Sequence, residues 1–516
     1  MNASLSSTRR RRAPLAAVAA ALLAAVALPT TGAASATAAT VPAVPSRYTQ
    51  QQLAWQPCTE APALECATMA VPRDWHHPDG GPDVSVAVSR HRASDPAQRR
   101  GTLLMAAGGP GGTGLLRPDT FVRAAPAVGA AYDVVGFDQR GVGHSTRAVC
   151  QTPEEFRAFF SGDFRDDSPA DRARVIDNSR RLAADCEQRS GGLLPYLTTE
   201  QTARDLDLFR ALLGERRISY YGPSYATMIG AYYATLFPRR VERMVLDSNV
   251  GFDGSWERFQ LGQPMSFQRR FEEDFLPWLA ARDSTYHYGV TVAEAKAHWE
   301  QRRAALHDSP LVDGSLTVGP NQLDNGTIQA VYRASDGFPG LATALTALDD
   351  WPSASPTARA TARLVFDQYL SPEFLAEYFA VTCNDTPWTR DLDTWVARGA
   401  EFTARRPLAG ARTLAFAAVC ASWPPPSAPR VRVRVTGAGL PPTLMLNSVH
   451  DPATYYEAAR SAHRALRGSR LVTVTGNGDH GQYPGPDSCV RRVVESYLLA
   501  GRAPDHDLTC PPPQAG

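Results

Sequence analysis

The chain has 516 residues, of which 43% are hydrophobic and 20% are charged, and its formal net charge is +1. This composition excludes a disordered chain, and the length excludes a small disulfide-stabilised scaffold. The near-zero charge gives no global field that would attract nucleic acid or an anionic membrane. We therefore expect a folded protein without a nucleic-acid partner.

Residues 1–38 are predicted to be a secretory signal peptide. The basic segment Arg9–Arg12 precedes an apolar run, Ala13–Leu28, which is too short to span a membrane comfortably. Small residues follow, and residues 34–36 and 36–38 both fit an A-x-A cleavage pattern. No later segment holds about 18 uninterrupted apolar residues, so we expect a secreted protein without stable membrane association after cleavage. An uncleaved N-terminal anchor is the alternative.

Residues 39–250 are predicted to form the first part of an α/β core. Apolar segments typical of strands alternate with segments that carry an apolar stripe typical of helices. Strands are expected at residues 84–89, 102–107, 132–137, 218–221 and 243–247, and helices at residues 199–213 and 225–237. This alternation implies a mostly parallel sheet that is covered on both faces.

The alternation breaks between residues 251 and 441, where the pattern is helical and irregular. Candidate helices are residues 266–281, 292–306, 356–369 and 391–403. Strands return at residues 443–446 and 471–475, and helices at residues 454–466 and 488–499. We therefore expect a large helical insert, a cap or second domain, before residues 442–516 complete the core.

Ser224 lies in the segment Gly222-Pro223-Ser224-Tyr225-Ala226, between a predicted strand and a predicted helix. This context matches the nucleophile elbow G-x-S-x-G, with Ala226 in place of the second glycine. Small residues at these positions let the helix cross close to the strand while the serine is held in an exposed, strained turn. We therefore predict that Ser224 is a nucleophile.

A serine nucleophile needs a base, and the base needs an acid to orient it. On a sheet with such an elbow, the acid and then the histidine follow the serine in the chain. Asp451 follows the strand at residues 443–446, and His480 follows the strand at residues 471–475. Because parallel strands place ligands at their carboxyl ends, we predict that Asp451 orients His480. Asp247, at the end of an earlier strand, is a rival acid.

The glycine-rich segment Gly108–Gly112 follows the strand at residues 102–107, where an oxyanion hole is expected. We predict that the backbone amides of Gly109 and Tyr225 bind the oxyanion. The segment does not match a phosphate-binding loop, because no G-x-x-x-x-G-K-[ST] motif is present. No C-x-x-C motif or close group of cysteine and histidine indicates a metal, so we expect neither a metal nor a cofactor.

The segments Gly108–Gly114, Phe137–Ser145 and Gly222–Tyr225 resemble those of the α/β-hydrolase peptidases. In particular, the chain is similar over about residues 53–510 to the secreted tripeptidyl aminopeptidases of actinomycetes, which are relatives of the prolyl iminopeptidases. The resemblance implies an α/β-hydrolase fold and a serine exopeptidase that removes short peptides from peptide substrates with free N-termini. A secreted carboxylesterase or lipase with the same triad is the alternative. A non-catalytic binding protein would require a broken triad.

An aminopeptidase must bind the ammonium group of its substrate. A carboxylate of the insert at a fixed distance from the serine would bind this group with directionality. Glu272, Glu273 and Asp274 lie early in the insert. We predict an amine-binding role for Glu272 and Glu273, with a solvated helix face as the alternative.

The chain contains eight cysteines. In an exported protein, an even number of cysteines predicts disulfides. Pairing neighbours in sequence gives Cys58–Cys66, Cys150–Cys186, Cys383–Cys420 and Cys489–Cys510. The alternative is that some cysteines are free thiols that behave as small buried hydrophobic groups.

Overall fold

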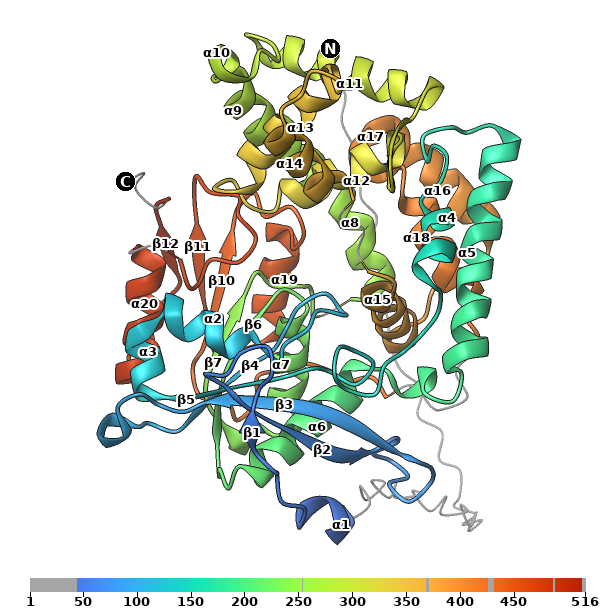
Figure 1. The fold of residues 1–516 in the computed structure, drawn as a ribbon. Coiled ribbons are helices and arrows are strands. Elements are labelled where there is room, and N and C mark those ends of the chain that lie inside the picture. Colours follow the sequence, from blue (N-terminus) through green and yellow to red (C-terminus); the bar gives the residue numbers. More distant parts are fainter. Residues whose placement is uncertain (1–43, 253, 368–370, 426–430, 486–487, 513–516) are drawn as a thin grey trace, which may run out of the picture. The chain divides into compact units, whose positions relative to one another are not determined.

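Figure 1 shows a computed structural model of the protein, which describes residues 44–252, 254–367, 371–425, 431–485 and 488–512. These residues belong to one compact unit. The predicted signal peptide lies outside the described residues and stays a prediction. Within the described ranges, no helix is long and apolar enough to cross a membrane.

A ten-stranded sheet forms the centre of the fold (Figure 1). In spatial order its strands are β1 (Gln56–Pro57), β2 (Glu65–Pro72), β3 (Asp83–His91), β5 (Asp133–Phe137), β4 (Thr102–Met105), β6 (Ile218–Pro223), β7 (Val241–Asp247), β10 (Thr443–Ser448), β11 (Ser469–Val474) and β12 (Leu508–Cys510). The pairs from β1 to β5 are antiparallel, and all pairs from β5 to β12 are parallel. The parallel strands bring their carboxyl ends to one edge, as the sequence predicts.

Successive residues of the central strands pack on opposite faces of the sheet. On β4, Leu103 belongs to one hydrophobic core and Leu104 to another, and Val134 and Val135 of β5 divide in the same way. The first core includes residues of α2 (Arg117–Ala124), α3 (Pro126–Ala131) and α20 (Cys489–Ala500), and the second includes residues of α6 (Thr199–Leu212), α7 (Ala226–Leu236) and α19 (Tyr456–Ala465). A strand that is buried on both faces needs an unbroken apolar run, which is what the sequence offers.

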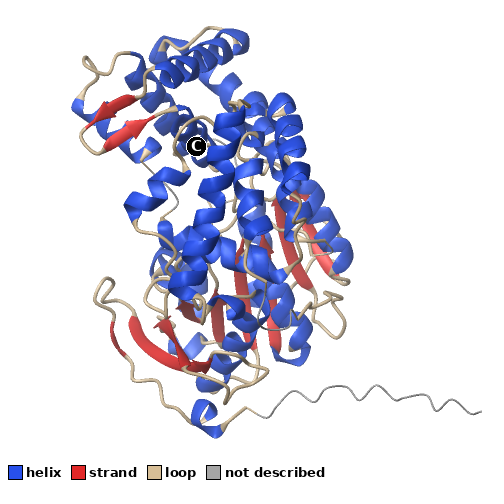
Figure 2. Ribbon diagram, turned by 90° about the vertical axis from the view of Figure 1, so that its right-hand side faces the viewer, coloured by secondary structure: helices blue, strands red, loops and turns tan. Residues whose placement is uncertain are grey.

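Between β7 and β10, the described residues form a mainly helical insert. Its elements are α8 (Trp256–Arg269), the π-helix η4 (Arg270–Phe275), α9 (Leu276–Ala280), α10 (Asp283–Tyr286), α11 (Val292–Asp308), β8 (Leu311–Asp313), β9 (Leu316–Val318), α12 (Pro320–Ala330), α13 (Gly337–Asp349), α14 (Pro356–Phe366), α15 (Pro372–Asp385), α16 (Leu392–Arg405), α17 (Pro407–Gly410) and α18 (Thr413–Ser422). Phe271, Trp299 and Leu341 belong to a core that is mostly the insert's own. Figures 1 and 2 show these helices gathered beyond one edge of the sheet.

Two helices that precede the insert in the chain pack against it. The sequence pattern predicts no element at α4 (Pro153–Phe159) or α5 (Pro169–Ser190). The hydroxyl of Ser179 on α5 donates to the carbonyl of Ala415 on α18 at 2.9 Å. The helical layer around the insert therefore includes residues from before position 251, and the predicted domain boundaries stay a prediction.

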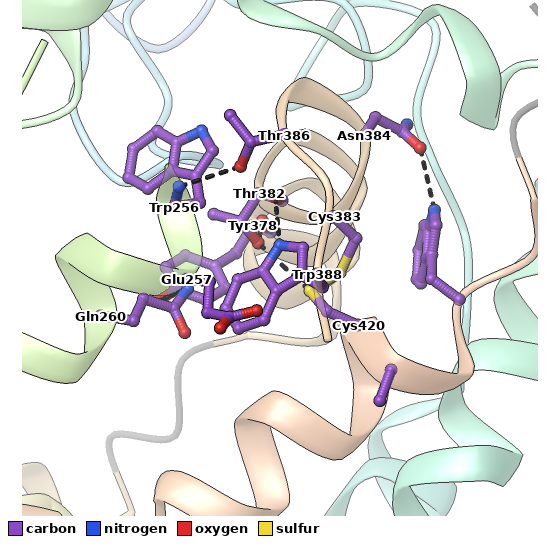
Figure 3. Close-up of a disulfide and its surroundings, with 12 residues drawn as sticks. Trp256, Glu257, Gln260, Tyr378, Thr382, Cys383, Asn384, Thr386, Trp388 and Cys420 are labelled. Atoms are coloured by element: carbon purple, nitrogen blue, oxygen red, sulfur yellow. Dashed lines mark hydrogen bonds between the residues drawn. A yellow bond between two sulfur atoms is a disulfide. The ribbon is translucent and has the colours of Figure 1, made fainter. Parts of the chain in front are cut away.

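The structure contains four disulfides: Cys58–Cys66, Cys150–Cys186, Cys383–Cys420 and Cys489–Cys510. They confirm the pairing of neighbours in sequence, and none of the described cysteines is free. The Cys383–Cys420 bond joins α15 to α18 inside the insert (Figure 3).

Candidate active site

Ser224 lies at the turn between β6 and α7 with a φ angle of 62°, in the left-handed region that is costly for a residue other than glycine. Its amide donates to the carbonyl of Asp247 at 2.8 Å, and its carbonyl accepts from the hydroxyl of Thr227 at 2.6 Å. A Cβ atom at Gly222 would lie 2.9 Å from the Cβ of Ala226. The elbow therefore requires glycine at position 222, and Ala226 fits as the second small residue.

The glycine-rich segment after β4 lies against Ser224. A Cβ atom at Gly108 would lie 2.8 Å from the Cβ of Ser224, so only glycine permits this approach. Gly109 has a φ angle of 123°, which glycine adopts readily. The predicted oxyanion donors, the amides of Gly109 and Tyr225, thus belong to the two segments that meet at the serine.

Asp138 anchors this glycine-rich segment. Its fully buried carboxylate accepts hydrogen bonds from the amides of Gly114 at 2.8 Å and Leu115 at 3.0 Å. The side-chain amide of the next residue, Gln139, donates to the carbonyl of Ala107 at 3.0 Å. The sequence marks these residues only through the family resemblance, whereas their contacts show that they position the predicted oxyanion loop.

His480 and the buried Asp451 form a hydrogen-bonded pair. The Nδ1 atom of His480 lies 2.9 Å and 3.0 Å from the two carboxylate oxygens of Asp451. The amides of Ala453 and Thr454 also donate to this carboxylate, at 3.0 Å and 2.7 Å. A histidine held in this way at Nδ1 keeps Nε2 available as a base.

The surroundings of His480 change its affinity for a proton. Burial lowers the pKa of His480, but the charge of Asp451 and the hydrogen bond to it outweigh burial, so the pKa is raised above 6.5. The hydroxyl of Thr454 lies 3.3 Å from the same Nδ1 atom. The sequence pattern does not mark Thr454 as a contact of the histidine, although its position three residues after Asp451 is visible in the sequence.

The rival acid, Asp247, binds the segment after His480 rather than its ring. Its carboxylate accepts from the amides of Gln482 at 2.8 Å and Tyr483 at 2.9 Å, and from the hydroxyl of Tyr221 at 3.0 Å. Burial raises the pKa of Asp247 to about 6, although these hydrogen bonds oppose the shift. Its contacts indicate a role in holding the loop that carries the histidine.

Ser224 and His480 line one cavity of about 1040 Å³ between the core and the insert. The insert side of the cavity is lined by Trp256, Phe259, Tyr332, Phe374, Tyr378, Arg412 and Phe416, among others. The carbonyl of Tyr332 accepts from the amide of His480 at 2.8 Å, and the two rings pack edge to face with their centroids 5.2 Å apart. The insert therefore helps to position the histidine.

Glu272 and Glu273 are not among the described residues that line the cavity. The carboxylate of Glu272 forms an ion pair with Lys296 at 2.5 Å, and the side chain of Glu273 is 60% exposed, with His450 3.9 Å away. Both lie in the π-helix η4, whose wider turn changes the face that each residue occupies. These positions do not support the predicted amine-binding role. Across the described ranges, no group of histidine, cysteine, aspartate or glutamate could hold a metal ion.

Comparisons with known proteins place the chain in a family. A family model described as "TAP-like protein" matches residues 406–510, which include Asp451 and His480. The chain is 36% identical over 484 residues to the tripeptidyl aminopeptidase of Streptomyces lividans, which covers 90% of this chain and 88% of the relative. Two Mycobacterium tuberculosis proteins are also similar. The serine protease Hip1 is 29% identical, and the match covers 89% of this chain and 91% of the relative. Carboxylesterase B is 31% identical, and the match covers 89% of this chain and 90% of the relative. The chain therefore belongs to the tripeptidyl aminopeptidase family and is a serine hydrolase with the α/β-hydrolase fold.

Proposed function

We propose that the protein is a secreted serine exopeptidase that releases tripeptides from the free N-termini of peptides. The observation that carries this proposal is the hydrogen-bonded pair of Asp451 and His480. The ring of His480 lines the same cavity as Ser224. The similarity to the tripeptidyl aminopeptidase of Streptomyces lividans supports the substrate class.

In the proposed mechanism, the hydroxyl oxygen of Ser224 attacks the carbonyl carbon of the scissile peptide bond while Nε2 of His480 accepts the hydroxyl proton. Asp451 holds the ring and stabilises its protonated form. The amides of Gly109 and Tyr225 bind the oxyanion. When the C–N bond breaks, His480 gives its proton to the leaving amine, and an acyl-enzyme remains on Ser224. Water, activated by His480, then hydrolyses this ester and frees the peptide.

The insert supports an exopeptidase rather than an endopeptidase. On the insert side, the hydroxyl of Ser266 donates to the carbonyl of Pro452 at 2.7 Å, and the side chain of Gln263 donates to the carbonyl of Ala453 at 2.8 Å. These contacts seat α8 directly on the turn that carries Asp451. A cavity covered in this way, and near the upper end of the usual volume of about 300–1,000 Å³ for ligand pockets, suits a short peptide better than a long chain.

Secretion is supported by the four disulfides together with the predicted leader. Disulfides form and persist in oxidising compartments and are rare in the cytosol. Residues 1–38 are expected to be absent from the exported form. Mass spectrometry of the protein in the culture medium would find the mature N-terminus.

The direct test combines active-site labelling with defined substrates. A fluorophosphonate probe should label the protein and should fail to label Ser224→Ala. Anilides that carry one, two or three residues with a free amine should be compared by kcat/KM, and the proposal requires the three-residue anilide to be the best substrate. A best substrate of one or two residues would contradict the tripeptidyl specificity and leave the nucleophile in place.

A carboxylesterase is the second candidate function, because the chain is 31% identical to carboxylesterase B of Mycobacterium tuberculosis. Esters and amides use the same triad and the same oxyanion hole. Short-chain p-nitrophenyl esters should therefore be assayed beside the peptide anilides. Rapid ester hydrolysis with no cleavage of any free-amine peptide would favour the esterase.

A further inference from the structure

Arg412 differs from the other charged groups of the catalytic cavity because its side chain has neither an acid partner nor a hydrogen-bonded backbone carbonyl among the described residues. Besides His480, the charged residues among the described lining are Arg117, Arg333, Arg412 and Asp479. Asp479 accepts from the guanidinium of Arg270 at 2.6 Å, and Arg333 lies 3.6 Å from the carboxylate of Asp336. In the described ranges, Arg117 also has no carboxylate partner, but its Nε donates to the carbonyl of Thr113 at 3.0 Å. Within the part of the chain that the structure describes, no carboxylate forms an ion pair with Arg412 and no carbonyl accepts from its side chain. A guanidinium without an acid partner therefore lines the site of the proposed reaction.

Two aromatic rings hold the guanidinium of Arg412. Its central carbon lies 5.2 Å from the ring centroid of Phe267 and 5.2 Å from that of Phe416. Such cation–π contacts tolerate a charged group but leave its N–H donors unused. Burial lowers the pKa of Arg412, yet an arginine stays charged at any physiological pH. Arg412 is half-buried, and a partly desolvated charge without a partner is costly, so an anion that entered the cavity would be attracted to it.

Tyr332 and Tyr378 line the same cavity as Arg412, and its positive charge acts on both phenols. Burial raises the pKa of Tyr332 to about 12 and that of Tyr378 above its usual value, and Arg412 opposes both shifts. Both hydroxyls therefore stay protonated at neutral pH. The side-chain amide of Gln260 donates to the hydroxyl oxygen of Tyr378 at 2.9 Å, which leaves the proton of that hydroxyl available to a ligand. We refer to Arg412, Tyr332 and Tyr378 as the Arg412 cluster.

A covalent bond supports this arrangement. Tyr378 lies on α15, and Arg412 directly precedes α18. The Cys383–Cys420 disulfide joins these two helices, and Figure 3 shows Tyr378 and Gln260 among the residues that surround it. Donors that are fixed before a ligand arrives lose less freedom on binding, which favours affinity and selectivity.

We propose that the Arg412 cluster binds a carboxylate of the peptide substrate and gives the enzyme a preference for peptides that carry one. The planar guanidinium can bind both oxygens of a carboxylate, and the two phenols add further donors. The carboxylate can come from an acidic side chain or from the C-terminus of a short peptide. This inference rests on the proposed peptidase function for its substrate class.

The first arm of the test uses tripeptide anilides, which have no C-terminal carboxylate. Alanine is replaced at each of the three positions in turn by glutamate and by the neutral, similarly shaped glutamine. If an acidic side chain is the ligand, glutamate should exceed glutamine in kcat/KM at one position by about ten- to hundredfold, the range expected for hydrogen bonds between charged groups. The effect should lie mainly in KM.

The second arm compares alanine tetrapeptides that end in a free acid with the same peptides ending in an amide. If the C-terminus is the ligand, the acid should exceed the amide by a similar factor. Both arms are repeated with Arg412→Gln, with Tyr378→Phe, which removes one donor and keeps the ring, and with Arg117→Gln as a matched control. Arg117 lines the same cavity, and its Nε donates to the carbonyl of Thr113 at 3.0 Å.

The two ratios of kcat/KM are glutamate over glutamine and free acid over amide. The inference is supported if one of them is large in the natural protein and falls to about one in Arg412→Gln. That ratio should also decrease in Tyr378→Phe and persist in Arg117→Gln. It is overturned if neither ratio exceeds about twofold, or if Arg412→Gln leaves a large ratio unchanged. Continued cleavage of the neutral alanine anilide then shows that the peptidase function stands without it.

Calorimetry keeps the two proposals separate when no peptide is cleaved. The Ser224→Ala variant is titrated with amidated tripeptides that contain glutamate or glutamine, and with the alanine tripeptide as free acid or amide. Tighter binding of a carboxylate that is lost on adding Arg412→Gln supports the inference even if the peptidase function fails. Equal binding of the charged and neutral peptides overturns it.

Discussion

Asp451 and Asp247 are both buried aspartates at the ends of neighbouring parallel strands, yet their contacts differ. Asp451 is bonded to the ring of His480, and Asp247 to the backbone after it. We expect Asp451→Asn to lower kcat by about 10³–10⁴, because the histidine loses the partner that fixes its tautomer. Asp247→Asn should lower kcat far less, since it disturbs only the support of the loop. Steady-state kinetics of both variants test this order, and a larger loss for Asp247→Asn would reverse the assignment of the acid.

The raised pKa of His480 predicts a shifted pH profile. The neutral imidazole is the base, so kcat/KM should increase as pH increases through the folded-state pKa, with a midpoint above 6.5. The protonated pair with Asp451 stabilises the fold below pH 6.5, and this contribution is lost as pH rises through that higher pKa.

In Asp451→Asn the attraction is removed while burial remains, so the acid limb of the residual activity should move to lower pH. The measurement is kcat/KM from pH 5 to 9 for both proteins. A midpoint that stays in place in the variant would show that Asp451 does not set the pKa of His480.

At the residue scale, the sequence predicts the roles that strand ends dictate. Ser224, Asp451 and His480 each follow a recognisable strand. In the structure, Ser224 and His480 line one cavity, and Asp451 is hydrogen-bonded to His480. Glu272 and Glu273 are predicted from their charge and their position early in the insert. A π-helical turn, which sequence periodicity does not reveal, holds them outside the described lining of the cavity. Arg412 could not be identified in the sequence, because its distinction is that its side chain has neither an acid partner nor a hydrogen-bonded carbonyl among the described residues.

At the scale of elements, Arg140 of the segment Phe137–Ser145 joins this segment to α6. Its guanidinium forms two hydrogen bonds with Asp205, at 2.8 Å and 2.6 Å, and both side chains are buried. Breaking a buried pair by removing one partner costs about 3–5 kcal/mol, because the other charge stays buried. We therefore expect Asp205→Ala to lower the free energy of unfolding by about this amount in chemical denaturation.

The matched control is Glu242→Ala, which removes the partner of Arg217 at 2.8 Å on the partly exposed surface. Surface pairs contribute about 0–1 kcal/mol. Equal destabilisation by the two variants would show that burial does not amplify the Arg140 pair.

Helices and strands can be predicted where the local hydrophobic pattern of the sequence agrees with the burial of the residues in the structure. β4 is fully buried, so its apolar run identifies it without knowledge of its neighbours. α5 is mostly polar, and the residue that Ser179 contacts, Ala415, lies far along the chain. β12 has three residues, too few to show a periodicity. Both therefore depend on tertiary contacts that no local window of sequence contains.

At the scale of the whole molecule, the four disulfides lie in different parts of the fold, and only Cys383–Cys420 lies in the insert. Reduction should lower the melting temperature, because the unfolded chain gains conformational entropy when the disulfides are removed. Loss of a native bridge lowers the stability of a small domain by about 2–5 kcal/mol, and we expect a smaller loss per bridge in a chain this large. Thiol titration of the denatured, unreduced protein should find no free cysteine. Eight free thiols would contradict the disulfide framework.

The last prediction concerns the free N-terminus, which distinguishes an aminopeptidase from an esterase on the same fold. An acetyl group lengthens the acyl part of the substrate inside a cavity that the insert covers, and it removes the ammonium charge. We expect acetylation of the best tripeptide anilide to lower kcat/KM by at least about tenfold, since one lost hydrogen bond to a charged group is worth about 1.5–3 kcal/mol. On the free peptide, activity should also decline above about pH 8, where the α-amine loses its proton. The acetylated peptide should lack this alkaline limb but keep the acid limb set by His480. Measuring both substrates from pH 5 to 10 tests the two effects together, with a p-nitrophenyl ester as a control that carries no amine. Equal rates on the free and acetylated peptides would overturn the aminopeptidase proposal and leave the triad intact.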